Sequence, residues 1–165
     1  MGNLTVTVLR VVLALVLAGT LFVQTVMVPL VWRDMDGADA DVLAIRVPFL
    51  LIVVLGIATV QVCAVCVWRL LTMVRRGTVF SHAAFRYVDV IIGAITAASL
   101  LAFALGAVLA PGDAAAPGIV LLIGGVGLTI LGIALIVLVL RMLLVQAVDR
   151  DAEATTLQAE LDEVI

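Results

Sequence analysis

Four long apolar runs restrict what this chain can fold into more than any other feature of its sequence. They cover residues 11–32, 47–68, 88–110 and 119–140. An α-helix of about twenty residues spans roughly 30 Å, the hydrocarbon thickness of a bilayer. A chain of 165 residues that is 65% hydrophobic could not bury four such helices in a soluble core. We therefore predict an all-α integral membrane protein that forms a four-helix bundle.

Proline, glycine and capping residues indicate where these helices begin and end. Pro48 suits a first helical turn, Gly77 a C-terminal cap and Ser81 an N-terminal cap. The first run is longer than the core of a signal peptide, so we expect a permanent helix there. The predicted helices cover residues 10–32, 47–76, 82–110 and 118–146. These limits divide the chain into a four-span membrane domain, residues 1–148, and an acidic tail, residues 149–165.

The distribution of arginine indicates the orientation, because short cytoplasmic loops carry an excess of positive charge. All nine cationic side chains are arginines. With the N-terminus inside, only Arg33 and Arg46 lie on the outer side. We therefore expect both termini in the cytoplasm. The abundance of Ala, Val, Gly, Asp and Arg suggests a bacterial genome of high GC content, and thus a bacterial cell membrane.

Small residues recur at helical spacing in the third and fourth spans. Such residues let helix backbones approach closely where lipid supplies no hydrophobic drive between helices. We predict that the two small-residue faces pack against each other; the alternative is a face for a homo-oligomer or a partner helix. The residues are Ala94, Ala98, Ala102 and Gly106 in the third span and Gly118, Gly125 and Gly132 in the fourth.

Two motifs suggest metal or redox chemistry, but neither is complete. Cys63 and Cys66 share one helix face, yet tetrahedral zinc needs four ligands and His82 is the only histidine. We interpret the two thiols as small buried residues, with a redox or metal switch as the alternative. The acidic loop from Asp34 to Asp41 lacks the glycine and glutamate positions of a calcium-binding EF-hand. We expect a solvated loop there, with weak divalent binding as the alternative.

Strongly polar residues inside the predicted spans are few. Asp89 lies one turn inside the third span, where Arg86 at i−3 is placed to pair with it. Gln24 and Gln61 lie deepest, at predicted depths that differ by roughly 10 Å. We expect these amides to bond neighbouring helices rather than a substrate. A nucleophile beside a base, paired carboxylates and a phosphate loop are all missing, so we predict no enzyme, catalytic residue, metal or cofactor.

Two segments on the predicted cytoplasmic side are candidates for binding a protein partner. The loop between the second and third spans is basic and aromatic, while the tail carries six acidic residues and one arginine. Apolar residues of the tail share one helical stripe, which suits a basic groove on a protein better than anionic lipid. The alternative is a solvated helical extension of the fourth span. The candidate residues are Arg75, Arg76, Phe80, Arg86, Leu157, Leu161 and Val164.

Two stretches of the sequence carry a family resemblance. One is Arg76-Gly77-Thr78-Val79-Phe80-Ser81, with Phe85-Arg86 at the start of the third span; the other is the ending from Leu157 to Ile165. Together with the four-span layout, they resemble the DUF2975 family of bacterial four-helix membrane proteins over most of the chain. The family has no assigned activity. The resemblance implies a gene often located beside one for a small helix-turn-helix DNA-binding regulator.

These features favour a non-enzymatic membrane adaptor or sensor that engages a cytoplasmic protein, with the helix-turn-helix regulator as candidate partner. We expect the bilayer to be its solvent and expect no direct contact with nucleic acid. Two alternatives remain open. A small transporter or channel subunit, as an oligomer, would line an aqueous cavity with Gln24, Gln61 and threonines. A structural envelope protein would alter membrane permeability without altering transcription.

Overall fold

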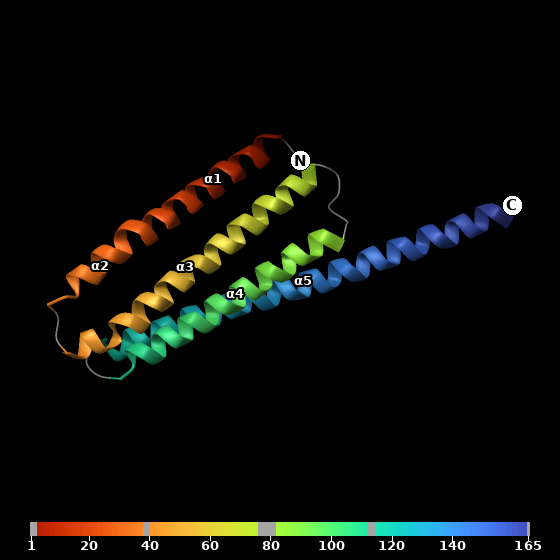
Figure 1. Ribbon diagram of the computed structural model, residues 1–165. Coiled ribbons are helices and arrows are strands. Elements are labelled where there is room, and N and C mark those ends of the chain that lie inside the picture. Colours follow the sequence, from red (N-terminus) through yellow and green to blue (C-terminus); the bar gives the residue numbers. More distant parts are fainter. Residues whose placement is uncertain (1–2, 38–39, 76–81, 112–114, 165) are drawn as a thin grey trace.

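The computed structural model of this protein contains helices joined by short turns (Figure 1). It describes residues 3–37, 40–75, 82–111 and 115–164. Four helical segments are long and apolar enough to cross a membrane: Leu4–Asp34, Leu43–Met73, Phe85–Leu109 and Pro117–Gln158. This confirms the predicted all-α class with four helices able to span a membrane.

The first of these segments is one continuous rod with a widened turn in its middle. Helix α1 (Asn3–Phe22) leads into the π-helical turn η1 (Val23–Met27) and then into α2 (Val28–Asp34). The Val28 N–H donates to the Val23 carbonyl, a five-residue spacing. Pro29 follows directly, and its ring would clash with a carbonyl four residues earlier in a regular helix. The wider turn accommodates that ring and lets the rod continue past the proline.

The second rod begins earlier than the sequence predicted. Helix α3 (Ala40–Arg75) contains Pro48 within its length, whereas we expected the proline to mark its first turn. A proline near a helix start removes only one backbone hydrogen bond. The added turns place Arg46 against the end of α2, where it binds Asp36. This contact gives the early helix start a tertiary partner that the sequence pattern did not reveal.

The remaining helices are α4 (His82–Leu109) and α5 (Pro117–Val164). Their antiparallel packing follows from the short connection between them. All four rods run alternately up and down. The start of α1, the end of α3 and the start of α4 lie together at one end, called here the Arg10 end (Figure 1). The opposite end, called here the Asp36 end, holds the end of α2 and the start of α5.

The sequence predicted a four-helix bundle, and the rods of this bundle form an open row. Over the described residues, α1 packs on α3, α3 on α4 and α4 on α5, while the pairs α1/α4, α1/α5 and α3/α5 approach little or not at all. Figure 1 shows α1, α3 and α4 side by side, with α5 behind α4. Lipid explains the open row, because it solvates apolar helix faces that water would drive into a closed core. Both outer helices therefore keep most of their apolar side chains exposed.

Helices α4 and α5 pack through small residues, but not all of those predicted. A Cβ placed on Gly127 would lie 3.3 Å from the Ala102 Cβ, and one on Gly106 would lie 3.8 Å from Ile123. The Ser99 hydroxyl, 1% exposed, donates to the Gly127 carbonyl over 2.8 Å. The seven-residue glycine series was the wrong choice for this interface. A Cβ on any of its members, Gly118, Gly125 and Gly132, would meet nothing within 4 Å.

The physical reason is the position of these glycines around α5. Gly127 follows Gly125 by two residues, about 200° around the helix axis, so the two face opposite sides. Of the predicted α4 stripe, Ala102 and Gly106 lie at the α5 interface. Ala94 lines a groove between α3 and α4 instead. The α4 stripe thus serves two neighbours, because α4 lies between α3 and α5 in the row.

Helix α5 is 48 residues long and extends far beyond its neighbour α4, which has 28. The cross-helix contacts Ser99–Gly127 and Asp89–Arg141 set the register between them. That register places the first residue of α4 level with roughly residue 146 of α5, which leaves about 27 Å of helix projecting. Figure 1 shows this projection at the Arg10 end. The acidic tail is therefore a continuation of the fourth rod through Val164.

Candidate functional site

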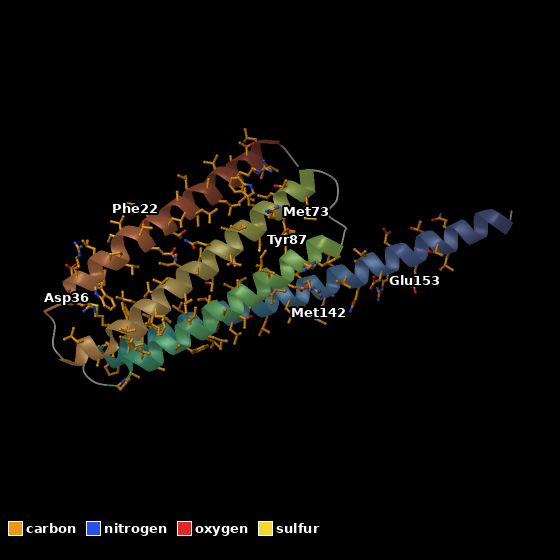
Figure 2. All side chains as sticks on the ribbon, viewed as in Figure 1. Phe22, Asp36, Met73, Tyr87, Met142 and Glu153 are labelled. Carbon is orange, nitrogen blue, oxygen red and sulfur yellow. The ribbon has the colours of Figure 1, made fainter. Side chains whose placement is uncertain are left out.

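Polar contacts join neighbouring rods at three levels along their length: at the Asp36 end, in the middle and at the Arg10 end. At the Asp36 end, the Arg46 guanidinium donates to the Asp36 carboxylate over 2.6 Å and also to the Trp32 carbonyl. It lies 3.6 Å from the centroid of the Trp32 ring. Arg46 is 8% exposed, so this is a desolvated cation that is paired on two sides. Asp36 lies at the end of α2 (Figure 2), in the loop considered above for calcium. Its carboxylate is used as the counterion of Arg46.

The middle level joins α1 and η1 to α3 through amides. The Gln61 amide donates to the Gln24 carbonyl oxygen over 2.9 Å and to the Thr20 hydroxyl over 3.3 Å. The Gln24 amide donates to the Val54 carbonyl over 3.3 Å. These bonds confirm the prediction that the two glutamines bond neighbouring helices. Thr20 and Gln24 lie one turn apart, about 6 Å, and two long amide side chains bridge that distance.

The third level lies at the Arg10 end and involves two separate pairs of helices. Between α1 and α3, Arg10 donates to the Thr72 hydroxyl over 3.2 Å. Between α4 and α5, the Arg141 Nε lies 2.8 Å from Asp89 Oδ1, and its Nη2 donates to Oδ2 over 2.9 Å. The predicted pairing of Asp89 with Arg86 was wrong. The Arg141 guanidinium on the neighbouring helix contacts both oxygens of the Asp89 carboxylate, a bidentate geometry that suits arginine.

A cleft of about 330 Å³ opens beside this ion pair, where α5 leaves α4. Arginine and aspartate side chains and three apolar side chains form its walls. Arg86, one of the predicted partner-binding residues, is exposed there. The lining residues are Phe85, Arg86, Asp89, Arg141, Val145, Val148 and Asp149. A mixed lining of this kind suits a protein side chain or short segment with both apolar and charged groups.

The projecting part of α5 continues from this cleft. Asp149, Asp151 and Glu153 are exposed on it, and Figure 2 shows Glu153 well beyond the part of α5 that lies against α4. Leu157 is 60% exposed, so the apolar stripe of the tail begins on a free helix surface. The cleft and this projection, called here the α5 surface, form the best candidate functional site. The tail was predictable from the sequence and the cleft was not, although Asp89 and Arg141 lie toward the Arg10 end of two spans predicted to be neighbours.

Several other predicted site residues lie outside the described side chains. These are Arg75, Arg76, Phe80, Leu161 and Val164, as well as Asp39 and Asp41 of the acidic loop. Cys66 is buried, Cys63 is partly buried, and both are free thiols. Within the part of the chain that the structure describes, no three His, Cys, Asp or Glu side chains come together as metal ligands would.

Comparison with known proteins gives one match. The sequence model of DUF2975, described as a protein of unknown function, matches residues 30–165. That range includes the α5 surface, the Gly127 interface and the whole of α3. No curated protein and no solved structure matches the chain.

Proposed function

The chain belongs to the DUF2975 family, and from that premise we propose a non-enzymatic membrane adaptor or sensor that engages a cytoplasmic protein through the α5 surface. The projection of α5 beyond the other rods carries this proposal. A helix that served only to cross the bilayer would need about twenty residues. Helix α5 has 48, and the surplus extends its charged part away from the membrane.

The orientation that we propose has both termini in the cytoplasm of a bacterial cell. Its support is the asymmetry of arginine between the two ends of the row. Arg10, Arg69, Arg86 and Arg141 belong to the Arg10 end, whereas only Arg33 and Arg46 belong to the Asp36 end. Of this last pair, Arg46 is already neutralised by Asp36. We therefore propose that the Arg10 end, with the α5 surface, is the cytoplasmic side.

The charge of the projection defines the kind of partner. Six acidic residues and one arginine between positions 149 and 165 give a net side-chain charge of −5. Such a helix attracts a basic protein surface and repels anionic lipid headgroups. A DNA-binding helix-turn-helix regulator presents a basic surface of this kind. Binding of that surface to α5 would hold the regulator at the membrane and compete with DNA.

Truncation and neutralisation of the tail test this proposal together. Membranes would carry the full chain, residues 1–148 alone, or a chain with Asp149, Asp151 and Glu153 changed to amides. We expect the full chain to capture the regulator, the truncated chain to lose it, and the neutralised chain to bind less in a salt-dependent manner. Deletion of the gene should change transcription of the regulator's targets. Equal capture by all three chains would reject the α5 surface as the binding site.

The transporter alternative receives less support from the side-chain contacts. Gln24, Gln61 and Thr20 are the residues with which a polar path would be lined, and they bond one another instead. A structural envelope protein would need no charged projection. An unchanged transcript profile with altered permeability in a deletion strain would favour either alternative over the adaptor.

A further inference from the structure

Arg10 is a part-buried cation near the start of the first rod. Its Nη2 donates to the Thr72 hydroxyl over 3.2 Å, and its Cζ lies 5.9 Å from the centroid of the Trp68 ring. Its Nε is buried without a hydrogen-bond partner among the described residues, as are those of Arg46 and Arg141, but no described carboxylate pairs with its guanidinium group. A hydroxyl and an aromatic face do not neutralise a guanidinium charge within an apolar span.

Two other arginines of the row, Arg46 and Arg141, differ from Arg10 because each has a carboxylate partner. Arg46 is paired with Asp36 over 2.6 Å and Arg141 with Asp89 over 2.8 Å. No equivalent is available to Arg10 from its own helices, because the sequence has no Asp or Glu in residues 1–33 or 42–88. The anion that compensates Arg10 must therefore come from outside α1 and α3.

A groove lined by Trp68, the ring that Arg10 approaches, indicates the nature of that anion. It lies between α1 and α3 with a volume of about 420 Å³, lined by Ala14, Leu17, Val65, Trp68 and Arg69. Its lining is almost wholly apolar apart from the Arg69 side chain, which is exposed. Among the described residues Arg69 has no ion-pair partner. Arg69, which has no described carboxylate partner, thus lines the groove, and the Arg10 guanidinium lies 5.9 Å from the ring of Trp68, another lining residue.

We infer that this groove binds a phospholipid with an anionic headgroup. The phosphate accepts hydrogen bonds from Arg10 and Arg69, and one acyl chain lies along Ala14, Leu17 and Val65. Arginine matches a phosphate with two parallel N–H groups, and tryptophan suits the boundary between headgroups and acyl chains. Arg10 is about 9 Å along the helix from Leu4, the start of the apolar span, a depth at which long cationic side chains reach headgroups.

A lipid fits this site better than a soluble anion or a protein. The groove opens between two helices whose apolar faces are exposed along the span, and α1 has no buried residue there. A free phosphate would use the arginines and leave the apolar length of the groove unexplained. A lipid supplies the charge and the hydrocarbon together. This site is separate from the α5 surface, so its test is independent of the proposed function.

Native mass spectrometry tests this inference. The full chain is released from nanodiscs of phosphatidylcholine that contain phosphatidylglycerol, and the lipid that stays bound is identified. We expect phosphatidylglycerol to be retained in preference to phosphatidylcholine. Arg69→Gln and Arg10→Gln should each reduce that retention about fivefold, the contribution typical of one arginine at an anionic lipid surface. Arg33→Gln, an exposed arginine at the opposite end of the same rod, is the matched control and should retain the lipid.

A second variant addresses the hydrocarbon part of the site. Ala14→Trp fills the groove but keeps both arginines, so it should also lose the lipid. Arg69 is exposed and unpaired, so Arg69→Gln leaves the fold intact and decides the question even if Arg10→Gln unfolds the chain. Equal retention of both lipids by the unaltered chain would overturn the inference. So would retention of phosphatidylglycerol that is unchanged by Arg69→Gln and by Ala14→Trp.

Discussion

Replacing Gly127 by leucine should separate α4 from α5, whereas the same change at Gly125 should not. The two glycines lie in the same apolar span, two residues apart, on opposite sides of α5. A Cβ at position 127 alone would lie 3.3 Å from the Ala102 Cβ and 3.4 Å from the Phe103 Cζ. A Cβ at position 125 would meet nothing within 4 Å. The pair of variants therefore tests helix packing with residue type and membrane depth held nearly constant.

The expected magnitude follows from the contacts at Gly127. Forcing a larger side chain into a packed interface costs about 1–3 kcal/mol. Separating the helices also breaks the 2.8 Å hydrogen bond from Ser99 to the Gly127 carbonyl. Such bonds between membrane helices contribute roughly 1 kcal/mol. The gain in helix propensity from losing glycine is common to both variants and cancels. We expect Gly127→Leu to be about 2–4 kcal/mol less stable than Gly125→Leu.

Unfolding in mixed detergent micelles, followed through thiol labelling, measures this difference. Cys63 and Cys66 are free thiols on α3, one partly buried and one buried, and they become reactive when the chain unfolds. Equal losses of stability for the two variants would refute the assigned α4/α5 interface. A larger loss at Gly125 would instead restore the seven-residue glycine series as the packing face.

Three further substitutions test the polar contacts between rods. Gln61→Leu removes the bonds to Thr20 on α1 and to Gln24 on η1 and should lower the free energy of unfolding by about 1 kcal/mol. Increased spin-label distances between α1 and α3 are the readout. Asp89→Asn should lower the free energy of unfolding by at most about 1 kcal/mol, because the Asp89 carboxylate is half exposed. The control, Asp151→Asn on the projection, should leave the melting temperature unchanged. Arg46→Gln should lower the melting temperature more than Arg33→Gln, because only Arg46 is buried against a carboxylate and an aromatic ring; equal shifts would contradict that assignment.

The number of spans was predictable because it depends only on run length. A run of about twenty apolar residues has few uses outside a membrane. The lengths of the rods were less predictable. Pro48 predicts a helix start, yet α3 begins at Ala40, and the added turns let Arg46 bind Trp32 on α2 and Asp36 just after it. Proline and capping residues predict where a helix can begin, and a tertiary contact decides where it does begin.

Interfaces between rods could be predicted only in part, because periodicity does not fix rotation about a helix axis. Of the small residues of α4, Ala102 and Gly106 lie at the α5 interface. On α5 the packing face depends on the partner helix, and Gly127 faces α4 although it lies outside the more regular seven-residue series. The same limit explains Asp89, whose local neighbour Arg86 was preferred to the cross-helix Arg141. The open row itself has no sequence signature, since lipid and helix solvate an apolar face equally well.

Photocrosslinking from position 157 in living cells tests the central claim most directly. A photoreactive residue replaces Leu157 on the α5 projection, and the same residue at Leu121, which is 79% exposed within the apolar span, is the control. The account predicts an adduct between position 157 and a basic cytoplasmic protein, with lipid adducts at position 121. Neutralising Asp149, Asp151 and Glu153 should weaken the protein adduct. Adducts at position 157 that contain only lipid or proteins from outside the cell would contradict it.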